Sequence, residues 1–477
     1  MANFFHGVRT SRGEGSQTVN AAASGVVFAV GTAPVNQVGD YPKIALVSSM
    51  ADAKEQLGYS DDWETYTLCE VMYSHFRAQA VGPLLLVNVA DPATNKETEE
   101  EAPKAVVNGQ VELPEGAIRE SITVKNESNT LNVGEDYEIF YQDGHCYIEA
   151  VSGGKMTNLS KVTVGYDTFT FELDDLKTAV IGGYNASTGE NSGMELVNDC
   201  YAEHQVNPDI IIAPGFSSDP EVAAVMAAKA GCINTVFKGR AIIDADCETT
   251  KVYSGVPKWK NDNSITGERQ ILCWPMMKIG ERVFHLSSRL AAIMAATDVD
   301  NGDCPSKSPD NKELGATSLC LKDGTNVVMN LEKANYLNAN GVMTGLNFVG
   351  SFKAWGSHTA CFPGSSDPVE CLIPVARMFD WVGNSLILTY WSRIGDKLDR
   401  RLCESIADSS SQWMNSLTAA GHLYGGRVEF DEGENSEKDI MAGILKPHVY
   451  MAPVSPLVEV NWIQEYDSSY VTGALGS

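Results

Sequence analysis

One unit of the sequence, residues 209–245, restricts the possible folds more than any other. An apolar run at 209–213 ends at Pro214-Gly215, and a second apolar run follows at 240–245. Between the two runs a helix opens near Pro220, where the missing N–H of proline does no harm. Consecutive strands joined through a helix favour a parallel arrangement in one sheet. The sequence therefore predicts an α/β core.

The alternation of strands and helices continues on both sides of this unit. Helices are predicted where apolar residues recur at three- and four-residue spacing, and buried strands where short apolar runs end at Gly or Pro. Before the unit we expect strands at 25–31, 44–47 and 84–89 and helices at 51–57, 65–80 and 194–205. After it we expect helices at 283–296, 374–388 and 399–420 and a strand at 427–430.

The stretch 105–171 interrupts this pattern. Its short alternating runs are divided by Gly, Asn and Asp, as in a small all-β domain. Asp143-Gly144 within it is typical of a hairpin turn. The preceding residues 93–104 are charged and contain Pro103, so we expect them to form a linker.

Short apolar runs and turn residues also fill a later stretch, 336–362. Asn340-Gly341 offers the positive φ angles of a tight turn, and the Phe, Val and Trp residues of 346–355 fit a pleated, half-buried surface. We find no paired carboxylates or metal-ligand cluster in this stretch. We interpret it as scaffold.

Together these patterns predict a mixed α/β, multidomain chain with an assembly core built from its N- and C-terminal parts. The expected parts are an extended arm (1–23), the N-terminal α/β part of the core (24–92), the linker (93–104), an inserted all-β domain (105–173), a middle α/β domain (174–335), a C-terminal core domain (336–452) and a C-terminal strand arm (453–477).

The charge balance limits the partners of the chain. With 35 Lys and Arg against 62 Asp and Glu, its formal net charge is −27, which argues against binding to nucleic acid or to an anionic membrane. The cysteines are scattered without a Cys-x-x-Cys pair, as expected for reduced thiols. We recognise neither a signal peptide nor a run of about 20 apolar residues, so we expect folding in a cytoplasm and no membrane insertion.

An α/β enzyme of the hydrolase type is the alternative to a structural protein, because ligands of such sheets bind at the carboxyl ends of strands. Ser217 or Ser218 could be a nucleophile, and Asp244 with Asp246 could hold a divalent cation. The serines lack a Gly-x-Ser-x-Gly elbow, and no third metal ligand is evident. We therefore favour packing and capping roles and expect neither catalytic residues nor a metal or cofactor.

Two acidic loops resemble fragments of a calcium-binding loop. The loops at 262–268 and 298–303 lack the combination of Gly at the sixth and Glu at the twelfth position of a calcium loop. We predict that both are solvated turns.

Four basic residues stand out against the acidic background: Arg393, Lys397, Arg400 and Arg401. A helix over this stretch would place them on one basic stripe. The stripe is either a solvated face tied by Asp396 and Asp399, or a docking face for an acidic protein surface, where complementary charge sets register and orientation.

The last apolar run, 457–466, alternates between two faces of a strand. One face carries Val458, Val460, Trp462 and Gln464, and the other carries Leu457, Glu459, Asn461 and Ile463. A strand with one apolar face must pair with another element.

Several motifs in a fixed order now resemble those of the tail sheath proteins of contractile phage tails and phage-tail-like bacteriocins. They are FHGV (5–8), GVVFAVGTAPVN (25–36), GPLLLVNV (82–89), PDIIIAPG (208–215) with AIIDAD (241–246), LNANGV (337–342) with FKAWGSHT (352–359), RRLCESIADSSSQWMNSL (400–417) and LVEVNWIQ (457–464). The resemblance covers nearly the whole chain. In the β insert it is one of architecture alone.

The resemblance implies a non-enzymatic subunit that polymerises in helical rings around an inner tail tube and contracts from a metastable extended state to drive the tube through a cell envelope. Its implied partners are copies of itself, the inner tail tube protein, and baseplate and tail terminator proteins, in a virion or bacteriocin tail assembled in the bacterial cytoplasm. Arg393, Lys397, Arg400 and Arg401 become a candidate tube-facing surface. The implied subunit-exchange strands contain Phe4, Phe5, Val8, Leu457, Val458, Glu459, Val460, Asn461, Trp462 and Ile463.

Overall fold

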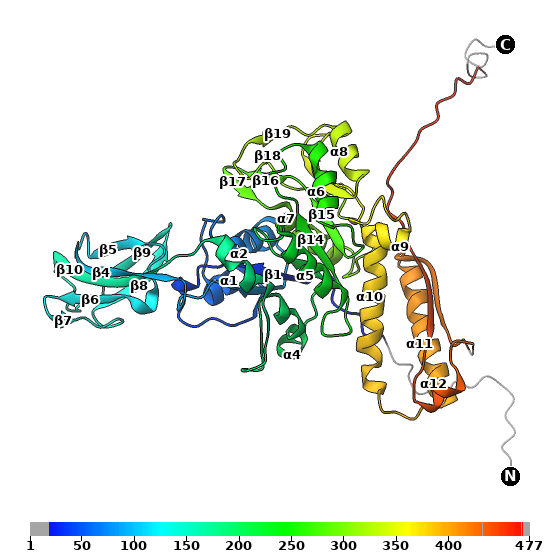
Figure 1. Ribbon diagram of the computed structural model, residues 1–477, viewed down its shortest axis with the longest axis horizontal. Coiled ribbons are helices and arrows are strands. Elements are labelled where there is room, and N and C mark those ends of the chain that lie inside the picture. Colours follow the sequence, from blue (N-terminus) through cyan, green and yellow to red (C-terminus); the bar gives the residue numbers. More distant parts are fainter. Residues whose placement is uncertain (1–18, 432, 469, 471–477) are drawn as a thin grey trace.

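The structure is a computed structural model that describes residues 19–431, 433–468 and 470. Figure 1 shows three parts in a row along the long axis: a β domain at one end, an α/β body in the middle and a helical layer at the other end. The predicted mixed α/β fold with several sheets is confirmed.

The body is built on one eight-stranded sheet. Its strands, in spatial order, are β2 (Ala45–Val47), β3 (Leu84–Asn88), β1 (Val27–Gly31), β13 (Ile210–Ile212), β14 (Arg240–Asp244), β15 (Gln270–Cys273), β20 (Val342–Asn347) and β21 (Phe352–Trp355). The six inner strands are parallel, and the two edge strands are antiparallel to their neighbours. The parallel sheet predicted from residues 209–245 is therefore present.

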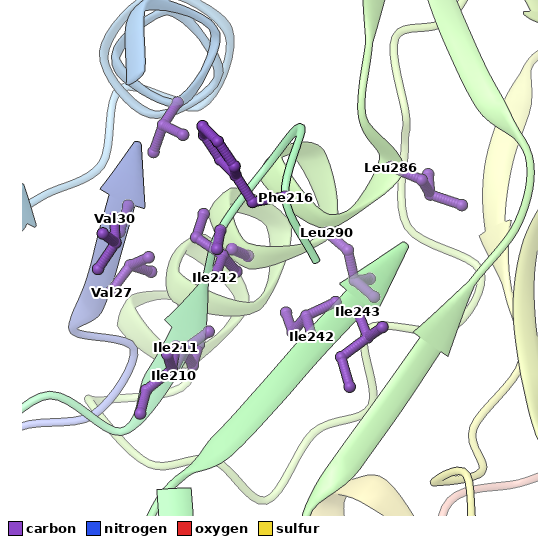
Figure 2. Packing of buried hydrophobic residues seen from close by; sticks show 14 of the residues in the cluster. Val27, Val30, Ile210, Ile211, Ile212, Phe216, Ile242, Ile243, Leu286 and Leu290 are labelled. Atoms are coloured by element: carbon purple, nitrogen blue, oxygen red, sulfur yellow. The ribbon is translucent and has the colours of Figure 1, made fainter. Parts of the chain in front are cut away.

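The central strands are buried on both faces, as expected for a parallel sheet covered by helices. The helices packed against β13 and β14 include α5 (Pro220–Gly231) and α7 (Leu286–Val299). Figure 2 shows the valines of β1, the isoleucines of β13 and β14, and Leu290 of α7 in this core, with Phe216 beyond the end of β13.

One sheet thus joins three ranges that we expected as separate parts. Strands of 24–92, of 174–335 and of 336–452 are hydrogen-bonded side by side. The division of the chain into an N-terminal core part and a middle domain is therefore wrong, because β1 pairs directly with β13 in parallel register. Sequence order hides this pairing, since the whole β domain lies between the two strands.

The β domain consists of two small sheets around their own core. One sheet contains β4 (Lys96–Ala105), β10 (Lys161–Phe169), β6 (Thr123–Asn126) and β7 (Asn129–Thr130), and the other contains β5 (Gln110–Pro114), β9 (His145–Ala150) and β8 (Tyr137–Gln142). Val124, Ile148 and Val164 are among the buried residues between the sheets.

The expected linker at 93–104 is wrong, because most of it forms β4, which pairs with β10. The glutamates that suggested a linker lie on an exposed edge strand, where charge and Pro103 prevent pairing with other chains.

The two Asx-Gly pairs behave differently from each other. Asp143 and Gly144 both have positive φ and join β8 to β9 as predicted. Asn340-Gly341 is not a hairpin turn, since it connects helix α8 (Leu331–Asn338) to β20, and only Gly341 has positive φ. The hairpin of this stretch lies instead between β20 and β21.

Several helices of the structure differ from the predicted ones in their bounds or in their helix type. The segment 194–205 contains a 3-10 segment (Gly193–Asn198) before the short α4 (Cys200–His204). Helix α2 (Thr67–Met72) continues as a π-helix (Tyr73–Gln79). Val283 belongs to β17 (Arg282–Phe284), which is part of a small antiparallel sheet with β16 (Met276–Ile279), β18 (Ser318–Cys320) and β19 (Asn326–Val327).

The helical layer contains the long helices α10 (Ile373–Tyr390) and α11 (Arg400–Ala419), and a two-stranded sheet of β22 (Leu423–Glu429) and β23 (His448–Pro453). The two helices are antiparallel, because Tyr390 bonds Ser410 (2.7 Å) while Trp381 contacts Trp413 near the other end of α11 (ring centroids 5.5 Å apart). Asp399 caps α11 by accepting a hydrogen bond from the amide of Leu402.

Candidate functional site

The strand order of the body reverses at β1 and β13, where α/β enzymes bind their ligands. Here the position is filled by Thr67, the first residue of α2. A Cβ atom at Gly31, which ends β1, would lie 2.3 Å from Thr67 Oγ1. The amide of Thr67 donates to Thr32 Oγ1 (3.0 Å), so the start of α2 is capped from inside the chain. The carboxyl end of β1 is therefore in close contact with the start of α2.

Ser217 and Asp244, the candidate nucleophile and metal ligand of a hydrolase, lie close together, but both are buried. Asp244 accepts hydrogen bonds from Ser217 Oγ (3.3 Å) and from the backbone amide of Ser287 (2.9 Å). Ser217 is fully buried, and burial raises the pKa of Asp244. Asp244 therefore caps the first turn of α7, while Asp246 bonds the amide of Glu248 in its own turn (2.8 Å).

A second buried carboxylate, which the sequence analysis missed, stabilises the same helix end. Glu70 of α2 accepts hydrogen bonds from His285 Nδ1 (3.0 Å) and from Ser288 Oγ (2.5 Å). The His285 side chain also lies near Asp244, and the two carboxylates outweigh desolvation and raise the pKa of His285 to about 9. No spacing in the sequence links Glu70 to His285, so only the fold could reveal this cluster.

Within the described residues, no group of three or more His, Cys, Asp and Glu could hold a metal ion. The acidic loop at 298–303 differs from the prediction, because Asp298 is fully buried rather than solvated. Arg377 of α10 binds both of its carboxylate oxygens, at 3.0 and 2.6 Å. The sequence could not show this, since the partner is 79 residues away.

Buried ion pairs join the helical layer to the body. Arg377 also contacts Asp209 at the start of β13 (2.7 Å), and Asp380 of α10 pairs with Arg240 (2.6 Å) and Arg269 (2.5 Å). Buried charges of this kind require fixed geometry, because removal of one partner leaves the other unpaired in a low-dielectric interior.

A surface depression of about 560 Å³ lies beside Lys260 of α6 (Val256–Asp262). The Lys260 ammonium donates to the carbonyls of Asn340 (2.6 Å) and Phe362 (2.7 Å), and burial lowers its pKa to about 8. These bonds connect two loops, so the lysine is explained by its structural role.

The C-terminal arm, residues 454–468, is the most exposed apolar segment of the described chain. It extends away from the body (Figure 1) and forms no strand ladder within the described residues. The side chains of its apolar face stay in solvent: Val458 is 60% exposed, Val460 54% and Trp462 83%. The predicted strand at 457–466 thus has no strand partner inside the described chain.

The basic residues do not lie on a single helix, so the condition for one helical stripe is not met. Arg393 ends a 3-10 turn, Lys397 lies in the following loop, and α11 begins only at Arg400. Gly395, with φ of +97°, interrupts the helical path between them. All four basic side chains are nevertheless exposed at the turn between α10 and α11. Phe4, Phe5 and Val8 lie outside the described residues.

Comparisons with known proteins agree with the motif-based resemblance. The chain is 26% identical to the tail sheath protein of Burkholderia phage BcepMu over 489 aligned positions, which cover 98% of both chains. It is 24% identical over 304 positions to a putative prophage major tail sheath protein of Pseudomonas aeruginosa, covering 62% of this chain and 75% of that one. No family model matches the chain.

Solved sheath structures share the fold at low sequence identity. The PVC sheath complex of an extracellular contractile injection system, in its contracted state, has a TM-score of 0.58 at 14% identity and covers 98% of this chain and 99% of that chain. The contracted helical sheath of the anti-feeding prophage has a TM-score of 0.57 at 14% identity, covering 97% and 99%. A sheath tail protein of Desulfitobacterium hafniense has a TM-score of 0.55 at 9% identity, covering 94% and 100%.

The carboxyl end of β1 is therefore packed by the start of α2, and the apolar side chains of the C-terminal arm are exposed. The chain is similar in sequence over its whole length to a phage tail sheath protein, and it shares the fold of solved sheath proteins, in agreement with the resemblance of the motifs. Nothing in the comparisons favours a hydrolase. Within the described residues, no helix has the length and apolar character needed to cross a membrane.

Proposed function

We propose that this subunit polymerises with copies of itself in helical rings around an inner tail tube and contracts from a metastable extended lattice to drive the tube through a target envelope. The observation that carries the proposal is the exposed apolar strand at 457–466, in a chain whose relatives are tail sheath proteins. A subunit of this kind needs no active site, because the energy of contraction is stored as differences between two sets of subunit contacts.

The C-terminal arm supplies one of those contacts by adding a strand to a sheet of a neighbouring copy. Strand addition satisfies the backbone groups of the arm and hides an edge that would otherwise aggregate. The sheet of β22 and β23 has only two strands in the described chain, so each strand has a single strand partner there. Burying the five large apolar residues Leu457, Val458, Val460, Trp462 and Ile463 would contribute on the order of 10 kcal/mol before the costs of association.

The N-terminal residues Phe4, Phe5 and Val8 are proposed as a second exchanged strand, on the basis of their motif. The exposed Arg393, Lys397, Arg400 and Arg401 are proposed to face the inner tube. Their clustering at one turn of an otherwise acidic chain supports this, because positive charge would set the register of an acidic tube surface. Baseplate and terminator proteins are the remaining proposed partners, at the two ends of the sheath.

Negative-stain electron microscopy of the purified full-length protein tests the proposal. We expect long tubular assemblies from the full chain and folded monomers from a variant that lacks residues 457–477. Circular dichroism and the thermal midpoint of the truncated variant should match those of the full-length chain before assembly. Persistent monodisperse monomer from the full chain, over a range of salt and protein concentrations, would refute the proposal.

A further inference from the structure

The first described residues of the chain lie along one face of α10. We call residues 19–24 the N-terminal strap. Its backbone is held by three side chains that follow one another at four-residue spacing on the helix, and which therefore share a face: Trp381, Ser385 and Thr389.

Each of these side chains bonds the backbone of the strap. The amide of Asn20 donates to Thr389 Oγ1 (2.9 Å), and the amide of Ala22 donates to Ser385 Oγ (2.9 Å). The Trp381 indole N–H donates to the carbonyl of Ala22 (2.8 Å). The strap is thus fixed through its main chain, as a strand is fixed in a sheet, but by helix side chains.

The hydroxyl groups are oriented for this purpose by their own helix. Ser385 Oγ donates to the carbonyl of Trp381 (2.7 Å), and Thr389 Oγ1 donates to the carbonyl of Ser385 (2.7 Å). A hydroxyl has one hydrogen to donate and two lone pairs. Because the hydrogen is used inside α10, a lone pair faces outward to accept a strap amide.

Two further contacts hold the other end of the strap. Ala22 is buried in the core of the helical layer together with Trp381. Ser24 Oγ donates to Asp298 (2.7 Å), the carboxylate that Arg377 binds. The strap therefore joins the same buried network that connects α10 to the body.

The strap gives the N-terminal residues a defined starting point. It runs antiparallel to α10, since Asn20 contacts Thr389 whereas Ser24 contacts the network of Arg377. The first described residues thus lie near the C-terminal end of α10. The C-terminal arm starts at the opposite end of the layer, where Val454 bonds His422 beyond the end of α11. An 18-residue helix such as α10 spans about 27 Å.

We propose that Trp381, Ser385 and Thr389 are positioning residues that anchor the strap and so determine where residues 1–18 leave the subunit toward a second copy of this chain. This inference rests on the proposed function. Residue 19 and the start of the C-terminal arm lie at opposite ends of the helical layer, so contacts made through the two ends of the chain would link one copy to two neighbours. Loss of the anchor would leave the fold intact but the direction of the N-terminal residues undefined.

Hydrogen exchange and electron microscopy on the full-length chain test this anchor. The variant S385A/T389V removes both hydroxyls at nearly constant volume. We expect the amides of Asn20 and Ala22 to exchange on the order of 10- to 30-fold faster, as for the loss of two ordinary hydrogen bonds. Amides in the centre of α10 should be unchanged, and tubes should become short or irregular.

Two controls separate the anchor from general stability. T389S keeps the hydroxyl and should behave as wild type. S416A/T418V removes two hydroxyls that donate to carbonyls of α11 itself, and it should leave strap exchange and assembly unchanged.

Unchanged exchange at Asn20 and Ala22 in S385A/T389V would overturn the anchor. Faster exchange with normal tubes would overturn its role in directing the N-terminal residues. If wild type and S416A/T418V also failed to form tubes, the proposed function would fail, and the directing role with it, whereas the exchange comparison would still decide whether the hydroxyls hold the strap.

Discussion

The strand β1 and the segment 457–466, which the sequence predicts as a strand, lie in opposite environments. β1 lies between β3 and β13, and its Phe28 is fully buried. The segment 457–466 is similarly apolar on one face, yet Trp462 remains 83% exposed and the segment has no strand partner within the described chain.

The difference in burial separates a segment that stabilises the subunit from one whose apolar surface is free for contact with another chain. β1 is completed by its own chain, so its side chains stabilise the subunit. The segment 457–466 has no strand partner within the described chain, so its apolar surface is available for the proposed strand exchange. Four experiments can break or sharpen this contrast, and they follow from the largest expected effect on subunit stability to the smallest.

Substitution of Phe28 by Ala should destabilise the subunit most. It removes a fully buried ring from the centre of the sheet, and such changes cost about 3–5 kcal/mol in cavity and transfer free energy. Urea unfolding followed by tryptophan fluorescence would measure the change in the free energy of unfolding. Phe348→Ala is the control, because Phe348 is 69% exposed and its loss should change stability by less than about 0.5 kcal/mol. Equal effects of the two variants would contradict the assigned core.

The same contrast between partnered and unpartnered groups applies to charges. Arg377→Met should cost roughly 3 kcal/mol, because Asp298 would remain buried without its cation. Arg400→Met is the matched control. The Arg400 side chain is 92% exposed, and its i,i+4 pair with Glu404 contributes only about 0.3–0.5 kcal/mol. The midpoints of thermal unfolding of both variants measure the two effects. An equally small effect of Arg377→Met would show that the ion pairs do not hold the helical layer to the body.

Alkaline pH should weaken the contact between α2 and α7. The buried carboxylates of Glu70 and Asp244 outweigh desolvation, and they raise the pKa of His285 to about 9. A raised pKa means that this stabilisation is fully present below about pH 6.5 and is lost as the pH rises through about 9. The loss should be on the order of 2–3 kcal/mol.

The test compares unfolding midpoints of wild type and His285→Gln at pH 7 and pH 10. Because other groups titrate in this range, the informative quantity is the difference between the two proteins. We expect that difference to shrink at pH 10. If it stayed constant, the protonated form of His285 would not contribute to stability.

Trp462→Ala should have the smallest effect on the subunit and a large effect on assembly. The exposed side chain contributes nothing to the subunit core, so the thermal midpoint should stay within error of wild type. Tube formation, scored by electron microscopy and sedimentation, should be strongly reduced. Asn461→Ala alters the other face of the same strand and should assemble more readily than Trp462→Ala. If Trp462→Ala lowered the thermal midpoint of the monomer, Trp462 would contribute to the subunit core as β1 does, and the assigned difference between the two segments would be wrong.

Several elements could be predicted because their causes are local. The run of isoleucines in β13, the proline at the start of α5 and the Asp-Gly turn at 143–144 each depend on a few neighbouring residues. The charged strand β4 was missed for the converse reason. Its glutamates resemble a linker unless one knows that β10, some sixty residues later, pairs with one edge of the strand.

The features of the candidate site also fall into those that local sequence patterns predict and those that depend on distant contacts. The alternation of 457–466 predicted an incomplete strand, because period-two patterning is a property of the segment itself. The sequence left open whether the basic residues at 393–401 share one helix, and the structure shows a break near Gly395, between α10 and α11. The strap on α10 could not be foreseen either, because its bonds join residues more than 350 positions apart.

The sequence by itself determined the α/β class, the all-β insert, the lack of catalytic and metal motifs, and the motifs shared with tail sheath proteins, because these are local patterns and their order. Only the tertiary structure decided that the N-terminal part shares one sheet with the predicted middle domain, that Thr67 packs at the end of β1, and that Asp298 and Glu70 are buried partners of distant residues. The physical reason is that burial and pairing are set by distant segments meeting in space, and the spacing along a single chain does not specify which segments meet.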